Sequence, residues 1–155
     1  MVSDFAESKR RGKCDLKRAS ATSKSKAAAP DLVVVGSVAQ DILHTATAST
    51  GKVLGGSAVH FANAASFFAR VGIVGIVGDD YPLEDLGFLR KRNVDLSGIA
   101  MAHGDSFLWE GRYTADFQDR ETIRTELGVF ADFKPLLPEH YRQPQVLFLA
   151  AIEPR

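Results

Sequence analysis

Residues 53–68 read VLGGSAVHFANAASFF, and this stretch decides how the rest of the chain is interpreted. Two adjacent glycines, Gly55 and Gly56, stand between an apolar run and a segment whose alanines and phenylalanines recur at helical spacing. Glycine loses more conformational entropy on folding than any other residue, so a pair at this joint needs a reason. A tight turn requires one glycine. Two glycines that open a helix over 57–69, with Ser57 as its N-cap, indicate that something approaches the backbone closely.

Continuous apolar runs on either side of this stretch predict strands buried on both faces. They are LVVVGSV (32–38), VGIVGIVG (71–78) and VLFLAAI (146–152). A second helix is expected over 82–93, where a proline and acids precede a basic Arg-Lys-Arg end. The alternation of strands and helices predicts an α/β fold with a parallel sheet and right-handed crossovers.

Other segments alternate between apolar and polar residues and predict antiparallel strands with one wet face. Residues 41–54 are expected to form a hairpin or flap, and 106–114 should pair with 121–130. Alternation places Trp109 and Tyr113 on one face, apart from Arg112. A packing role is favoured for the two aromatic residues over substrate stacking.

The length of 155 residues predicts one domain, and the zero net charge conceals an uneven distribution. Residues 1–30 carry eight Lys/Arg against three Asp/Glu and have little to bury, so a disordered basic tail is expected there. The remainder is acidic and gives no sign of a nucleic-acid partner. Neither a membrane span nor a secretory signal is visible, and the single Cys14 is compatible with a reducing compartment, so a cytoplasmic location is expected.

Few residues carry a chemical signal on their own. Asp41 follows the first predicted strand at the carboxyl edge of the sheet, where open α/β folds bind ligands, and Glu153 follows the last one. His60 lies in the first turn of the helix that the diglycine opens. Of the two acids at 79–80, one is expected to cap the helix after Pro82. Only Gly36 follows the first strand, which opposes a dinucleotide-binding GxGxxG site, and no nucleophile arrangement is supported by spacing.

Four segments together carry a resemblance to a known family: GSVAQD, VLGGSAVHFANAAS, VGIVGIVGDDYP and KRNVDLSGI. In order and spacing they resemble the ribokinase-like (PfkB) carbohydrate kinases, from about residue 31 to 155. The resemblance implies a Rossmann-type parallel sheet flanked by helices, with a small antiparallel β lid at about 98–130. The chain would be the N-terminal part of such a kinase domain, with the C-terminal half missing.

The same resemblance implies a substrate site for a sugar or nucleoside. Asp41 would accept hydrogen bonds from two hydroxyl groups, while Gly55 and Gly56 would let the substrate lie against bare backbone. Glu153 falls where many members place another substrate-contacting acid. His60 stands where the family usually has asparagine, and an imidazole cannot donate and accept as an amide does.

ATP and Mg²⁺ are implied as cofactors, but the residues that would bind them lie in the missing half. The family's catalytic Gly-Ala-Gly-Asp motif does not occur in these residues, so no catalytic or metal-binding residue is expected in this chain. The predicted function is ATP-dependent phosphorylation of a sugar or nucleoside hydroxyl, of which this chain supplies the substrate-binding half. The alternatives are a non-catalytic sugar-binding or dimerisation module and an inactive truncated fragment. A homodimer through the lid is a further possibility, and an isolated fragment is expected to be marginally stable.

Overall fold

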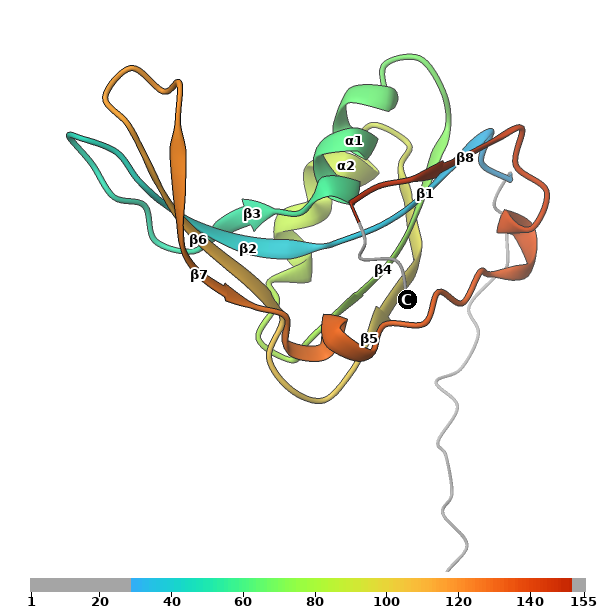
Figure 1. Ribbon diagram of the computed structural model, residues 1–155. Coiled ribbons are helices and arrows are strands. Elements are labelled where there is room, and N and C mark those ends of the chain that lie inside the picture. Colours follow the sequence, from blue (N-terminus) through green and yellow to red (C-terminus); the bar gives the residue numbers. More distant parts are fainter. Residues whose placement is uncertain (1–28, 152–155) are drawn as a thin grey trace, which may run out of the picture.

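The computed structural model describes residues 29–151. The expected tail at 1–30 falls almost entirely outside these residues, and Glu153 also lies outside them. In the described part, two four-stranded sheets meet near the middle of the molecule (Figure 1).

Sheet A is parallel, as expected, and contains the three strands that the apolar runs predicted together with a fourth, at 95–101, that they did not. Its strands lie in the order β5-β4-β1-β8, and every neighbouring pair is parallel. Their bounds are β1 (Leu32–Val35), β4 (Val71–Val77), β5 (Asp95–Met101) and β8 (Val146–Leu149).

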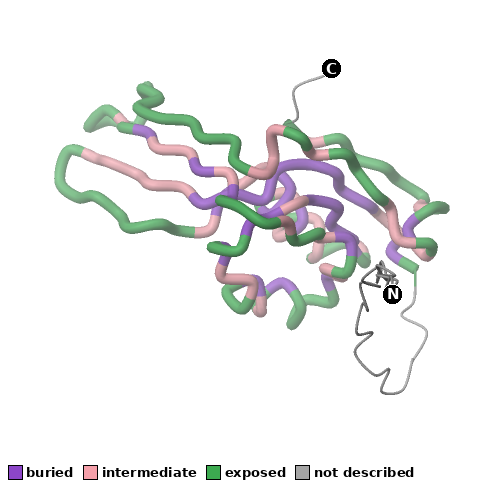
Figure 2. The backbone as a smooth tube through the Cα atoms, turned by 90° about the horizontal axis from the view of Figure 1, so that it is seen from below, coloured by how far each residue is buried: buried purple, intermediate pink, exposed green. Residues whose placement is uncertain are grey.

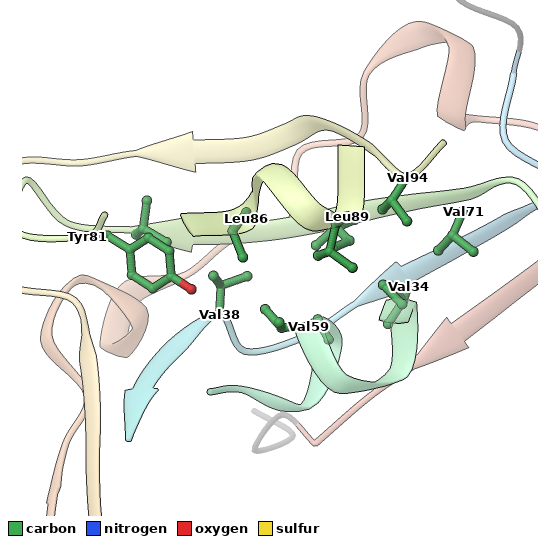
Figure 3. Packing of buried hydrophobic residues seen from close by; sticks show 12 residues of the cluster. Val34, Val38, Val59, Val71, Tyr81, Leu86, Leu89 and Val94 are labelled. Carbon is green, nitrogen blue, oxygen red and sulfur yellow. The ribbon is translucent and has the colours of Figure 1, made fainter. Parts of the chain in front are cut away.

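Helical segments connect these strands and cover one face of sheet A. They are α1 (Ser57–Ala65), the 3₁₀ turn η1 (Leu83–Leu86) and α2 (Gly87–Arg90). Side chains from α1, α2 and the sheet, among them Val34, Val59 and Leu89, point toward one another in the main core (Figure 3). On the opposite face Val33 and Val35 pack with the buried Tyr141 of the short turn η3 (Glu139–Tyr141).

Both predicted helices are shorter than expected. α1 ends at Ala65, and the hydroxyl of Ser66 donates to the carbonyl of Asn63 (2.8 Å), the local competition by which serine weakens helices. The stretch expected to be one helix over 82–93 is instead η1 followed by a single turn of α2.

Sheet B contains the antiparallel hairpins, joined by one parallel pair. The strand order is β3-β2-β6-β7, with β2 and β6 parallel and the outer pairs antiparallel. The strands are β2 (Ala39–His44), β3 (Val53–Gly55), β6 (Phe107–Tyr113) and β7 (Arg120–Glu126). The hairpins project to one side of sheet A, and Figure 2 shows that buried backbone is concentrated in and near sheet A while the hairpin tips are exposed.

The predicted lid at about 98–130 differs from sheet B at its start. Residues 98–101 belong to β5 of sheet A, because their backbone pairs with β4. The antiparallel strands of the lid begin only at Phe107. β2 and β3, which correspond to the hairpin or flap predicted over 41–54, form the other half of the same sheet.

The prediction that the last apolar run is a buried strand is wrong for the described chain. β8 forms as expected, but its four residues are 51, 52, 38 and 68% exposed. β8 is the edge of sheet A, and only Phe148 gains an aromatic partner, stacking on Phe61 of α1 at 3.7 Å. A strand needs cover on both faces to be buried, and residues 29–151 provide only part of it.

Candidate functional site

A cavity of about 1010 Å³ lies where sheet B meets the carboxyl end of β1 and the start of α1. One wall is the inner face of sheet B, and another comes from the segment after β7, which includes the 3₁₀ turn η2 (Gly128–Asp132). The lining residues are Ser37, Ala39, Asp41, Leu43, Gly56, Ser57, His60, Phe107, Trp109, Tyr113, Arg120, Leu127, Phe130, Ala131, Phe133, Pro135 and Ala151. Three of the residues singled out in the sequence, Asp41, Gly56 and His60, therefore face one space.

Asp41 is the acidic group of this cavity. It lies on β2, directly between Val53 of β3 and Trp109 of β6 in the strand register. Burial raises the pKa of its carboxyl group, and the nearby His60 opposes this shift. Among residues 29–151, no hydrogen-bond donor reaches the carboxylate. A half-buried carboxylate without hydrogen-bond donors is energetically unfavourable in the ligand-free protein, and hydroxyl groups of a ligand would stabilise it by donating hydrogen bonds.

Glycine is required at positions 55 and 56 for different structural reasons. Gly55 pairs with Ala39, and a Cβ added to it would overlap the carboxyl group of Asp41. Gly56 has a φ of +97°, and an added Cβ would overlap the carbonyl oxygen of Ser37 and come within 2.7 Å of the Ala39 nitrogen. Gly55 therefore makes room for a side chain, and Gly56 permits a close turn against the bend between β1 and β2.

The start of α1 is already capped, and not by the residue that the sequence indicated. The N-cap is Gly56, while Ser57 is the first helical residue. The buried Ser37 accepts the Ser57 N–H with its hydroxyl oxygen (2.9 Å) and the Ala58 N–H with its carbonyl oxygen (3.1 Å). Two of the N–H groups that an oxygen-rich ligand could have used are thereby taken.

His60 is exposed and lies one turn along α1, beside the same cavity. Its backbone N–H donates to the Gly56 carbonyl (3.2 Å), which fixes its place on the helix. Its side chain forms no hydrogen bond with the described residues, so the imidazole is free to contact a ligand near Asp41.

Aromatic side chains dominate the rest of the cavity wall. Trp109 and Tyr113 lie on one face of β6, as alternation predicted, with their rings edge to face at 6.5 Å. Phe107 stacks on Phe130 at 5.4 Å, and Phe130 stacks in turn on Phe133. The sequence favoured a packing role for Trp109 and Tyr113 over substrate stacking, and in the structure both residues line the cavity.

The acids at 79–80 do not cap a helix. η1 has no side-chain cap, and the Asp80 carboxylate instead accepts the backbone N–H of Ser106 (2.8 Å) and pairs with Lys52 (3.1 Å). These contacts tie the ends of β4, β6 and the β2–β3 hairpin together. Asp80 therefore supports the junction of the two sheets.

No group of three or more His, Cys, Asp or Glu in residues 29–151 is placed to hold a metal ion. Within the same range, no helix is both long and apolar enough to cross a membrane.

Comparison with solved structures identifies the architecture. The chain is similar to a ribokinase from Cryptococcus neoformans solved with ADP (20% identity, TM-score 0.55). The match covers 76% of this chain and 39% of the ribokinase chain. It is similar to an adenosine kinase from Sinorhizobium meliloti (19% identity, TM-score 0.60), with coverage of 79% of this chain and 47% of that one. A nucleoside kinase from Burkholderia thailandensis, solved with inosine, matches at 15% identity and a TM-score of 0.53, over 63% of this chain and 37% of that one.

The chain thus has part of a ribokinase-like fold and spans less than half the length of these kinases. This confirms the predicted α/β fold class and the resemblance to the ribokinase-like fold. No family profile matches the chain, and no curated protein matches it.

Sequence reasoning missed two polar residues of the cavity lining, Ser37 and Arg120. Ser37 was overlooked because a single serine between two strands belongs to no distinctive motif. Its position at the carboxyl end of the first predicted strand was a usable signal. Arg120 fell in a turn-like stretch and was not assigned to a face. In the structure it begins β7, with its guanidinium over the Trp109 ring at 5.4 Å.

Proposed function

We propose that this chain supplies the substrate-binding half of an enzyme that phosphorylates a hydroxyl group of a sugar or nucleoside with ATP. The observation that carries the proposal is the Asp41 carboxylate, half-buried in the cavity and without a donor among residues 29–151. A carboxylate accepts through two oxygens, which suits a pair of neighbouring hydroxyl groups. The ribokinase-like fold supports the same assignment.

Each candidate residue has a role in this proposal. Asp41 accepts the hydroxyl hydrogen bonds, and Gly55 leaves space for its carboxyl group. Gly56 holds the backbone turn that brings His60 beside the same ligand. His60 supplies one further hydrogen bond. Glu153 is proposed from the resemblance as another acid in contact with the substrate.

ATP and Mg²⁺ would supply the phosphoryl group and charge neutralisation. The described residues offer no metal-ligand group, and the sequence holds no Gly-Ala-Gly-Asp segment. Residues 29–151 therefore do not fit a nucleotide–metal site. We assign that site to the part of the kinase fold that this chain does not match. A homodimer through the predicted lid at about 98–130 and a cytoplasmic location stay predictions.

The test is calorimetric titration of the chain with ribose and with nucleosides, using Asp41→Asn as the variant. Hydrogen bonds to a charged group contribute about 1.5–3 kcal/mol, so we expect roughly tenfold to hundredfold weaker binding. Asp85→Asn is the matched control, because Asp85 is exposed on η1 and does not line the cavity. Equal binding by wild type and Asp41→Asn would refute the assignment.

A non-catalytic sugar-binding module makes the same binding prediction, and the absent Gly-Ala-Gly-Asp segment favours it for the isolated chain. Substrate-dependent release of ADP tests whether the chain is catalytic by itself. We expect none from the pure chain, and steady release would show that the chain alone is a kinase.

A further inference from the structure

We propose that the substrate is a nucleoside whose base stacks on Trp109, and that Arg120 selects a 6-oxopurine base such as that of inosine or guanosine. This inference rests on the proposed function and goes further by naming the substrate class and the residues that select it.

The Trp109 indole is held flat against the sheet. Gly111 follows two residues later on the same face of β6, and a Cβ added there would overlap the indole ring. The ring nitrogen donates to the Thr122 hydroxyl on β7 (3.3 Å), and the Tyr113 ring packs against the indole in a T-shaped contact. An indole laid over a bare glycine and fixed at its edges presents a ring face as a stacking platform. Planar bases stack on such platforms in many proteins.

The hydroxyl-binding and aromatic ends of the cavity are separate and ordered. In the parallel β2–β6 register, Asp41 lies opposite Trp109 and Leu43 lies opposite Gly111. Because the indole extends over Gly111, it lies beyond Asp41 along the strand direction. A ligand that fills both places has hydroxyl groups at one end and a flat apolar ring at the other. A nucleoside has this form, and a monosaccharide fills only the Asp41 end of a cavity of about 1010 Å³.

Arg120 supplies hydrogen-bond donors at the aromatic end. Within residues 29–151 it pairs with no carboxylate, whereas Arg112 and Arg124 on the same two strands do. Its guanidinium lies over the Trp109 ring, with Cζ 5.4 Å from the ring centre, so a base that stacks on the indole displaces it to the edge of the base, where its N–H groups can donate. Guanidinium only donates, which suits the O6 and N7 acceptors of a 6-oxopurine. Adenine places an N6 amino donor at the same edge, where it meets the guanidinium unfavourably.

The experiment is calorimetric titration of the 155-residue chain with ribose, inosine and adenosine. We expect inosine to bind at least about tenfold more tightly than ribose, given the usual contribution of base stacking. Inosine should also bind more tightly than adenosine. Fluorescence offers a second readout, because Trp109 is the only tryptophan of the chain and a stacked base should quench it.

Two variants test the residues separately. Arg120→Gln should weaken inosine binding severalfold and leave ribose binding unchanged, while Arg112→Gln is the matched control on the opposite face of sheet B and should alter neither. Gly111→Ala should displace the indole and weaken inosine binding, again without affecting ribose. Arg120 is exposed, so its replacement is expected to leave the fold intact, and circular dichroism checks that each variant is folded.

The outcomes separate this inference from the proposed function. Ribose binding as tight as inosine binding would overturn the base platform and leave the Asp41 site intact. Equal binding of adenosine and inosine, or an unchanged Arg120→Gln variant, would overturn the role of Arg120. If neither ribose nor any nucleoside binds the folded chain, the proposed function itself fails.

Discussion

Replacing Gly56 by alanine should destabilise the fold, and the structure allows the size of the effect to be worked out. Gly56 has a φ of +97°, which side chains with a Cβ rarely adopt. A non-glycine residue held in such a region costs roughly 1–3 kcal/mol.

Steric overlap adds to this strain. The new Cβ would meet the Ser37 carbonyl oxygen and the Ala39 nitrogen, both backbone atoms of the bend between β1 and β2. Backbone cannot rotate aside as a side chain does, and overpacking of this kind costs about 1–3 kcal/mol. The total of about 2–6 kcal/mol is a large share of the 5–15 kcal/mol by which domains are usually stable.

Urea unfolding followed by circular dichroism measures the effect. With a slope of about 2 kcal/mol per molar urea, the unfolding midpoint of Gly56→Ala should fall by about 1–3 M. Gly87→Ala is the matched control, because a Cβ at Gly87 meets nothing within 4 Å and the residue already has helical angles. That change should raise stability by about 0.5–1 kcal/mol. A Gly56→Ala midpoint within error of wild type would show that this reasoning about the turn is wrong.

Three further changes have expected outcomes. Gly55→Ala should leave the urea midpoint nearly unchanged but abolish ligand binding in calorimetry, because the added Cβ displaces only the movable Asp41 carboxyl group; a binding-competent variant would contradict this. Burial raises the pKa of Asp41, so its charged form destabilises the ligand-free fold. Asp41→Asn should therefore raise the urea midpoint at pH 7. The gain should vanish as the pH falls below 3.8, the ordinary pKa of an aspartate, because the wild-type carboxyl group is then protonated. Burial also opposes ionisation of Asp80, but hydrogen bonds from Ser106 and Lys52 outweigh it and lower the pKa. Asp80→Asn should therefore lower the midpoint at pH 7 and match wild type in strong acid, where the wild-type carboxylate is protonated; a difference that persists there would argue against this origin.

Three of the four strands of sheet A, namely β1, β4 and β8, could be predicted from the sequence because their cause is local, whereas β5 was missed. Three β-branched valines in a row at 33–35 leave little choice but a strand buried on both faces, and β1 forms there with all three buried. The alternation around Trp109 likewise predicted which residues share a face of β6.

The remaining features depend on partners that the local sequence does not name. The length of α1 was overestimated because the Ser66 hydroxyl bonds to the Asn63 carbonyl. The exposure of β8 follows from its place at the edge of sheet A, which strand order alone decides. For the candidate site, the diglycine and Asp41 were visible as motifs. The sequence alone could not show that Gly55 makes room for the Asp41 carboxyl group, because this follows from the register of β2 against β3.

The parallel pairing of β2 with β6 has a consequence for when the site comes into existence during folding. This strand pair makes Asp41 and Trp109 direct neighbours in the sheet, although they lie far apart in the sequence. Pairings between distant parallel strands are slow to form, since the chain between them must first be ordered. The hairpins β2–β3 and β6–β7 close locally and need not wait for it. The ability to bind a ligand should therefore appear late in refolding, after most of the helix and hairpin signal has been recovered.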